Sequence, residues 1–471
     1  MDLIRLTACE IVDLLKSGDI SPRDLLGALE NRIEAVDGQV CALPTRCFER
    51  AYDHAARLES MTPGSRGVLQ GMPVPIKDLA EVAGVRTTFG SQIFKDFVPD
   101  RSAHIVERIE DAGGIVYAKS NTPEFGAGGQ TFNEVFPTTR NPWNLALTAA
   151  GSSGGAAAAL ASGTAWLAHG SDMGGSLRNP ASFCGVVGLR PSPGRVPCGP
   201  GADPFANLAT EGPMARNVDD VALFLDAMSG VDAREPLSLP APARPFRGQA
   251  AERRPPPRVA FSADLGITPV DPEVADLTRH AAHRFGEAGS EVSERHPDFS
   301  GTHEAFQVLR AQDFAVGLSD SLRDNRDLLK PEVVWNIELG QQLSAGQIAE
   351  ATRIRGALSH RAAAFMADFD VLATPATILP PFPCDVRYPE ECAGRSFETY
   401  IDWLAIAFAI TLTGLPAISI PCGYTAAGLP VGLQLVGRPR GEGALLSAAG
   451  VLQDTLALPG TPIDPRPAAP S

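Results

Sequence analysis

Residues 149–183 read AAGSSGGAAAALASGTAWLAHGSDMGGSLRNPASF and contain two glycine-rich turns that each carry serine. In the first turn, Ser152 and Ser153 precede an alanine run, which favours a helix because alanine loses no side-chain entropy there. These serines are therefore predicted to lie at a helix N-terminus. In the second turn, Met173 to Ser176, consecutive glycines allow the backbone N–H groups to approach one oxygen closely. Such a turn suits an oxyanion hole.

Each turn taken alone has other interpretations. A Gly-Ser-Ser-Gly-Gly segment is more often a flexible or tightly packed loop than a catalytic one. A phosphate-binding loop is disfavoured because no Gly-Lys-Ser/Thr closes the first turn and no Gly-x-Gly-x-x-Gly follows a clear strand. The spacing of several motifs is more informative, since Ser176 follows Ser152 by 24 residues and Lys77 precedes Ser152 by 75 residues.

Across nearly its full length the sequence resembles the amidase signature family. The motifs that carry the resemblance are GMPVPIKD at 71–78, RTTFGS at 86–91, TRNPWN at 139–144, FCGVVGLRP at 183–191, GPMAR at 212–216, GLPAISIP at 414–421 and GLPVGLQ at 428–434. The resemblance implies an α/β fold, namely a single large domain with a central mixed, mostly parallel sheet flanked by helices. It also implies an amidohydrolase.

The expected organisation is one amidase domain over residues 1–471. Its parts are an N-terminal helical part (1–65), a signature core (66–230), a proline-rich surface segment (231–257) and a C-terminal part of the same core (258–471). Helices are predicted at 8–17, 22–36, 46–60, 103–112, 218–228, 272–288, 304–325, 331–345 and 347–368. Strands are predicted at 74–79, 115–118, 259–262, 370–373, 417–420 and 431–436. The β/α alternation favours a mostly parallel sheet.

By resemblance, the catalytic residues are Ser176 as nucleophile, Ser152 as a bridging serine held by a cis peptide bond, and Lys77 as base. A serine between lysine and nucleophile can pass a proton both ways. Lys77 must be neutral to accept a proton, so its pKa has to fall from about 10.4 toward 7 or 8, a shift of roughly 4 kcal/mol that burial would impose. The alternative for Lys77 is a surface side chain at a strand end.

The remaining site residues follow from the same resemblance. The backbone N–H groups of Met173, Gly174, Gly175 and Ser176 are expected to form the oxyanion hole. Ser153, Asp172 and Arg178 are expected to support the site through hydrogen bonds. The substrate pocket is expected to include Gly126, Gln130, Phe132, Tyr400 and Trp403, although these aromatic rings could instead fill the core. Met173 stands where threonine or isoleucine is usual in the family, which affects the shape of the pocket.

Three other functions compete with a free-standing amidase. The first is the amidase component of a tRNA-dependent amidotransferase, which binds glutamine and needs a partner subunit. In those amidotransferases an acidic residue binds the glutamine amino group, and Leu404 stands where we would align it. The sequence from Gln130 to Asn133 also differs from the motif of that subgroup. The second is a binding protein without activity. The third is a Ser-His-Asp hydrolase, but His169 lacks the carboxylate spacing of such a triad and is predicted to be a packing residue.

Composition limits the partners. The formal net charge of −15 disfavours nucleic acid and anionic membranes as partners. The family resemblance implies a small-molecule amide substrate. The eight cysteines show no Cys-x-x-Cys spacing, and neither a metal site nor a disulfide framework nor any cofactor is expected. Residues 403–437 carry no charge, but Gly414-Leu415-Pro416 interrupts them, so no membrane span is expected. The N-terminus lacks a signal-peptide pattern, which favours a cytoplasmic location. The sequence is compatible with a homodimer.

Overall fold

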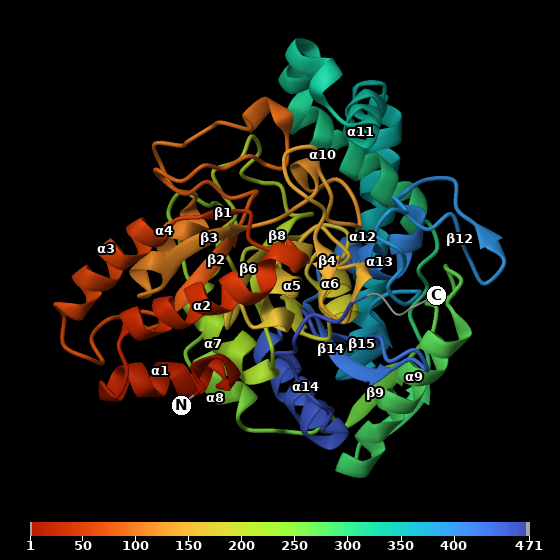
Figure 1. Ribbon diagram of the computed structural model, residues 1–471. Coiled ribbons are helices and arrows are strands. Elements are labelled where there is room, and N and C mark those ends of the chain that lie inside the picture. Colours follow the sequence, from red (N-terminus) through yellow and green to blue (C-terminus); the bar gives the residue numbers. More distant parts are fainter. Residues whose placement is uncertain (1, 468–471) are drawn as a thin grey trace.

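Short, largely buried segments form the central sheet of the computed structural model, which describes residues 2–467 (Figure 1). In spatial order its eight strands are β10 (Glu291–Glu294), β9 (Arg258–Phe261), β11 (Val371–Pro375), β15 (Pro430–Gly437), β14 (Ala417–Tyr424), β7 (Val187–Arg190), β8 (Thr210–Ala215) and β6 (Leu167–Asp172). The edge strand β10 is partly exposed, whereas β15 is buried throughout. The most buried strands therefore lie near the middle of the sheet.

The direction of the strands corrects one prediction. The sheet is mixed, as predicted, but within the described part of this eight-stranded sheet only β10–β9 and β9–β11 pair in parallel. The pairs β11–β15, β15–β14, β14–β7, β7–β8 and β8–β6 are antiparallel. The expectation of a mostly parallel sheet is therefore wrong. Parallel neighbours need a long crossover, whereas β14 and β15 are joined by a short hairpin, and an apolar strand pattern does not distinguish the two connections.

A second sheet brings the lysine motif to the centre of the molecule. Its order is β1 (Thr45–Arg46), β3 (Ile115–Ser120) and β2 (Pro73–Lys77), with β2 parallel to β3. Strand β2 also packs against β6 of the large sheet. There the backbone N–H of Lys77 donates to Nδ1 of His169 at 3.3 Å. Two hairpin pairs complete the strands, β4 (Arg140–Asn141) with β5 (Asn144–Thr148) and β12 (Glu391–Cys392) with β13 (Arg395–Ser396).

The first two N-terminal helices begin where local sequence signals predict, whereas the third begins two residues after its predicted start and has no side-chain cap among the described residues. These helices are α1 (Ala8–Ser17), α2 (Pro22–Val40) and α3 (Phe48–Glu59). Thr7 and Glu10 form a capping box at α1, and Ser21 caps α2, where proline occupies the first turn. Helix α2 continues four residues beyond the predicted end and stops at Cys41, whose φ is +57°.

Two short helices that follow the serine turns lie in the interior. Helix α5 (Gly154–Ser162) and helix α6 (Arg178–Cys184) are buried on all sides. The side chains of α5 are small or apolar, and the charge of Arg178 in α6 is paired with Asp172. Figure 1 shows both near the middle of the molecule. The other helices are α4 (His104–Asp111), α7 (Val218–Met228), α8 (Phe246–Ala250), α9 (Pro272–His283), α10 (Thr302–Asn325), α11 (Pro331–Gln341), α12 (Ala345–Asp368), α13 (Ala405–Thr413) and α14 (Glu442–Leu456).

The charge-free span and the proline-rich segment have different environments. Residues 403–437 form α13 and the hairpin β14–β15, which are buried within the fold. No helix within residues 2–467 is long and apolar enough to cross a bilayer. The side chains of residues 231–245 are exposed or partly buried. By contrast, Phe246 and Ala250 of α8 are buried, and α8 packs against α7 and α14. The proline-rich segment 231–257 thus contains a short helix that packs against the core.

Candidate active site

Lys77, the last residue of β2, points its amine at three serine hydroxyl groups. Its side chain is fully buried, and Nζ lies 2.7 Å from Oγ of Ser152, 2.8 Å from Oγ of Ser153 and 3.0 Å from Oγ of Ser171. The first two serines belong to the first glycine-rich turn, and Ser171 lies in β6. Three segments that are far apart in sequence therefore meet at one amine.

The surroundings of Lys77 favour the neutral amine. Burial lowers its pKa to about 7, against the opposing influence of the negative charges of Glu211 and Asp172. Within residues 2–467 the amine forms no ion pair, because its polar partners are hydroxyl groups and a carbonyl. The amine can therefore accept a proton near neutral pH.

The first serine turn is held by its backbone. The peptide bond between Gly151 and Ser152 is cis, and Ser153 is the N-cap residue of α5, as the alanine run predicts. A Cβ atom at Gly151 would lie 2.9 Å from backbone atoms of Gln130, so only glycine fits this approach. The N–H of Ser153 donates to the carbonyl of Ser176 at 3.3 Å, which joins the two serine turns directly.

Asp172 organises the second turn. Its Oδ1 accepts the N–H of Gly175 and its Oδ2 accepts the N–H of Leu177, each at 3.0 Å. The Gly175 N–H is thus already bonded to a carboxylate, unlike the N–H groups of Met173, Gly174 and Ser176, which have no hydrogen-bond partner among the described residues. Three of the four N–H groups expected in the oxyanion hole are free to donate to a ligand.

Two arginines keep Asp172 ionised. Arg178 donates to both carboxylate oxygens, from Nε at 3.0 Å and from Nη2 at 2.8 Å, and Arg190 lies 3.3 Å from Oδ1. Burial alone would raise the pKa of Asp172, but the charges and hydrogen bonds of these arginines hold that pKa well below its usual range. Arg190 was not predicted, although an arginine that ends an apolar strand motif is a signal that could have identified it.

In the described part of the chain, the hydroxyl of Ser176 is free to react with a ligand, whereas the ring nitrogens of His169 are already hydrogen-bonded. Ser176 is partly exposed, and its hydroxyl has no hydrogen-bond partner within residues 2–467. His169 is buried and does more than pack, because Nδ1 accepts from Lys77 and Nε2 lies 2.8 Å from Glu211. This network places the imidazole proton on Nε2, and no serine contacts the ring through a hydrogen bond in the described chain. A Ser-His-Asp arrangement is therefore not assembled.

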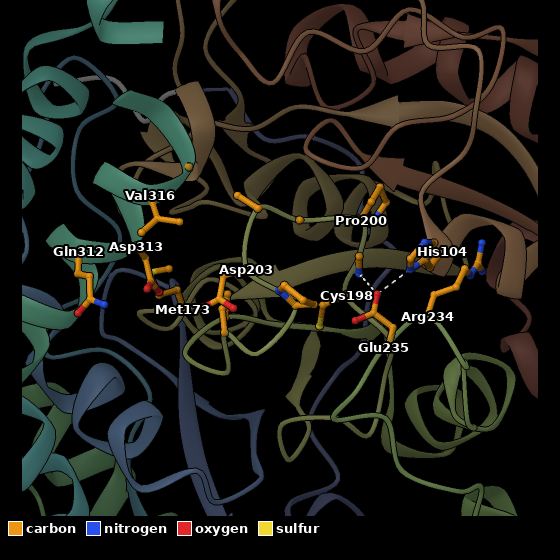
Figure 2. A pocket seen from close by; sticks show the side chains of 17 residues that line it. His104, Met173, Cys198, Pro200, Asp203, Arg234, Glu235, Gln312, Asp313 and Val316 are labelled. Carbon is orange, nitrogen blue, oxygen red and sulfur yellow. Dashed lines mark hydrogen bonds and ion pairs between the residues drawn. The ribbon is translucent and has the colours of Figure 1, made fainter. Parts of the chain in front are cut away.

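A cavity of about 390 Å³ adjoins the second turn. Figure 2 shows Met173, Asp203 and Asp313 together at one end of it, and His104 with Glu235 at the other end, where the ring and the carboxylate are 2.6 Å apart. Burial raises the pKa of Asp313 to about 6. Of the residues predicted for the site, Met173 is the one that lines this cavity.

The predicted pocket residues occupy several environments. A Cβ atom at Gly126 would lie 3.4 Å from Oγ of Ser152, so this glycine borders the serine turn. Trp403 is buried and packs on Gly129, and Tyr400 is also buried. Phe132 makes two cation–π contacts, with Nζ of Lys330 5.1 Å and the Arg387 guanidinium 4.8 Å from its ring centre. Gln130 is buried and donates to the Cys384 carbonyl at 2.7 Å.

Metal ligation has no candidate in the described chain. No group of three or more histidine, cysteine, aspartate or glutamate side chains that could hold a metal ion is found within residues 2–467.

Comparison with known proteins identifies relatives over almost the whole chain. A family model described as Amidase matches residues 24–446. A glutamyl-tRNA(Gln) amidotransferase subunit of Moorella thermoacetica is 37% identical over 479 residues, with 95% of this chain and 96% of that protein covered. An acylamidase of Rhodococcus erythropolis is 35% identical over 450 residues, with 94% of each chain covered.

A solved structure agrees with these relatives. The crystal structure of a bacterial aryl acylamidase of the amidase signature enzymes superposes with a TM-score of 0.89 at 28% identity, and 96% of each chain is covered.

Proposed function

Because this chain belongs to the amidase signature family, whose members hydrolyse amide carbon–nitrogen bonds, we propose that Lys77, Ser152 and Ser176 form its catalytic triad. The observation that carries the proposal is the buried amine of Lys77, which lies 2.7 Å from Oγ of Ser152. Its pKa of about 7 leaves a large fraction of the amine neutral at physiological pH.

In the proposed acylation step, Oγ of Ser176 attacks the carbonyl carbon of the amide. The proton of Ser176 passes to Ser152, whose own proton passes to Nζ of Lys77. The carbonyl oxygen becomes an oxyanion, which the N–H groups of Met173, Gly174 and Ser176 stabilise by hydrogen bonds. Collapse of this intermediate breaks the carbon–nitrogen bond, and the proton returns through Ser152 to the departing nitrogen.

Deacylation uses the same groups in the reverse direction. A water molecule gives a proton to the relay through Ser152 and attacks the acyl carbon, and the second tetrahedral intermediate releases the acid and restores the Ser176 hydroxyl. The Asp172–Arg178 pair positions the nucleophile turn rather than the substrate, because its carboxylate is already bonded to the Gly175 and Leu177 N–H groups.

We propose a carboxamide or aryl amide as substrate, hydrolysed through an acyl-enzyme on Ser176 and without a partner subunit. The apolar surroundings of the turn support this choice, because Phe306 approaches Gly174, and Trp403 lies near Phe183 of α6 with ring centres 6.4 Å apart. Burying one hydrophobic group would contribute about 1.5–3 kcal/mol. Values of kcat/KM should therefore favour alkyl or aryl amides over glutamine, and a preference for glutamine or asparagine would contradict the proposal.

A second candidate is an ammonia-supplying component of an amidotransferase. The 37% identity to an amidotransferase subunit favours it. The apolar, buried Leu404, at the position where we align the acidic residue for the glutamine amino group, argues against it. Hydrolysis of an anilide by the purified chain alone, with its mass determined by sedimentation, distinguishes an active monomer or homodimer from a protein that needs a partner.

The triad is tested by Ser176→Ala. We expect this variant to fold like the wild type, as judged by its thermal unfolding temperature, and to lose amide hydrolysis. A fluorophosphonate should label the wild-type protein at Ser176, as located by peptide mapping, and should leave the variant unlabelled. Stoichiometric labelling of any other serine would refute the assignment.

A further inference from the structure

Arg310, in the first half of α10, is a buried charge without a counter-charge. Its side chain is only 5% exposed, and it forms no ion pair within the described residues. Nη1 donates to Oη of Tyr400 at 3.0 Å, Nη2 makes a long contact of 3.5 Å to Gln307, and Nε has no partner. The nearby carboxylate of Asp402 is bonded instead to backbone N–H groups at 398 and 399.

Aromatic rings replace the missing carboxylate around this guanidinium. Its carbon lies 5.5 Å from the ring centres of Phe314 and Trp335 and 5.6 Å from that of Tyr400. Cation–π contacts stabilise the charge but leave Nε–H without an acceptor among the described residues and Nη2 with only the long contact to Gln307. In folded proteins a fully buried arginine is normally paired, because an unpaired buried charge is costly.

Other buried polar atoms around Tyr400 also lack partners. Asn336 of α11 donates to the same Tyr400 oxygen at 2.6 Å, and its Oδ1 is unpartnered. Trp403, three residues after Tyr400, has an unpartnered Nε1–H. Arg310, Asn336 and Trp403 are each more than nine-tenths buried, so bulk water does not satisfy these atoms.

Two aromatic residues link this cluster to the serine turns, namely Trp403 and Phe306, which is in the same helix as Arg310. Phe306 lies one helical turn before Arg310, about 6 Å along the helix axis. Its ring approaches Gly174, where an added Cβ atom would be 3.4 Å away. The Trp403 ring packs on Gly129, in the same loop as Gly126, which borders Ser152.

We infer that Arg310 is a specificity-determining residue that binds a carboxylate carried by the amide substrate. The planar guanidinium can offer its Nε–Nη2 edge to two carboxylate oxygens, a geometry that lysine cannot reproduce. The aromatic faces around it suit the apolar part of such a substrate. The inference rests on the proposed amidase function and narrows its substrates to amides with an anionic group.

The test compares matched anilides that differ in one carboxylate. Wild-type kcat/KM should be at least tenfold higher for succinanilic or glutaranilic acid than for the alkyl anilide of the same length. Arg310→Met should lower kcat/KM for the acids at least tenfold, mainly through KM, and should change the alkyl anilides less than threefold. Arg310→Lys should recover only part of the preference, because it restores the charge without the planar edge.

Arg355→Met is the matched control. Arg355 is a partly buried arginine whose Nε, unlike that of Arg310, donates to a backbone carbonyl of α13. It should keep the preference for the acids. Equal hydrolysis of acids and alkyl anilides by the wild type, or an equal loss of both in Arg310→Met and Arg310→Lys, would overturn the inference and leave Arg310 a structural residue.

Binding separates this inference from the proposed reaction. Titration calorimetry with Ser176→Ala should detect the anilide acids and should show at least tenfold weaker binding when Arg310→Met is added. If no amide is hydrolysed but this difference in binding persists, the proposed function fails and the carboxylate site stands. If hydrolysis proceeds without a difference in binding, the carboxylate site fails alone.

Discussion

Lys77 has the environment that a general base requires, since burial holds its pKa near 7 while three serine hydroxyl groups surround the amine. We predict that log kcat/KM for a neutral amide rises with pH through one ionisation at about 7 and then stays level. Below this pH the protonated amine cannot accept the proton of Ser152. A pH–rate profile between pH 5 and 9 measures the ionisation, and a flat profile would contradict a lysine base.

The same burial should reduce stability. Below its folded pKa of about 7, the native protein holds a charged amine away from water, and this penalty falls as pH rises toward the ordinary lysine value. We predict that the change in free energy of unfolding caused by Lys77→Met, variant minus wild type, is roughly 2–3 kcal/mol more positive at pH 6 than at pH 9. The free energy of unfolding in urea at both pH values measures this.

Lys16→Met, at an exposed position of α1, is the control and should show no such dependence on pH. The hydrogen bonds that Lys77→Met removes lower its stability at both pH values, so the difference between them is the informative quantity. Equal effects of Lys77→Met at pH 6 and pH 9 would mean that the amine stays charged in the folded protein over this range, so that burial does not lower its pKa.

At the scale of one element, the nucleophile turn contains two glycines with different constraints. Gly175 has a φ of +108°, and a Cβ atom there would lie 2.6 Å from both Cβ of Ala407 and Oδ1 of Asn179. Gly174→Ala would meet only the Phe306 ring at 3.4 Å or more. We predict that Gly175→Ala costs about 2–4 kcal/mol of stability and lowers kcat about a hundredfold, because the turn must move.

Gly174→Ala is the matched control for this turn. It should cost less than about 1 kcal/mol and should reduce kcat less than Gly175→Ala, since its contact is an ordinary van der Waals one. Thermal unfolding and kcat for one anilide measure both effects. If the two variants lose the same activity, the positive φ of Gly175 is not what shapes the turn.

At the scale of the whole molecule, Asp220 of α7 ties the N-terminal helix to the core. Its buried carboxylate accepts the N–H groups of Ala8 and Cys9, each at 2.9 Å, across more than two hundred residues. These N–H groups lie at the first turn of α1, where they have no partner within the helix. We predict that Asp220→Ala lowers the free energy of unfolding by about 2–5 kcal/mol.

The form of the transition tests the expected single domain. If residues 1–65 fold with the rest, calorimetry of Asp220→Ala should show one transition at a lower temperature. A separate early transition would mean that the N-terminal part unfolds alone. Asp13→Ala, which removes an exposed partner of Arg247, is the control and should change stability by less than about 1 kcal/mol.

The sequence by itself determined the features that depend on neighbouring residues. Helix starts at Thr7 and Ser21 were predictable because a cap bonds to amides two or three residues away. The approach of Lys77 to Ser152 followed from the family resemblance, and the apolar flanks of Lys77 indicated the direction of its pKa shift. Such signals lie within a few residues or within a motif, so no knowledge of the fold is needed to interpret them.

Only the tertiary structure decided how distant segments meet. An apolar strand pattern is the same for either direction, so a mixed sheet with five antiparallel pairs was found where a mostly parallel sheet was predicted. The bond from Asp172 to the Gly175 N–H, the contribution of Arg190 and the isolation of Arg310 were likewise invisible in the sequence. A buried charge is defined by which distant residues surround it, and that depends on the path of the whole chain.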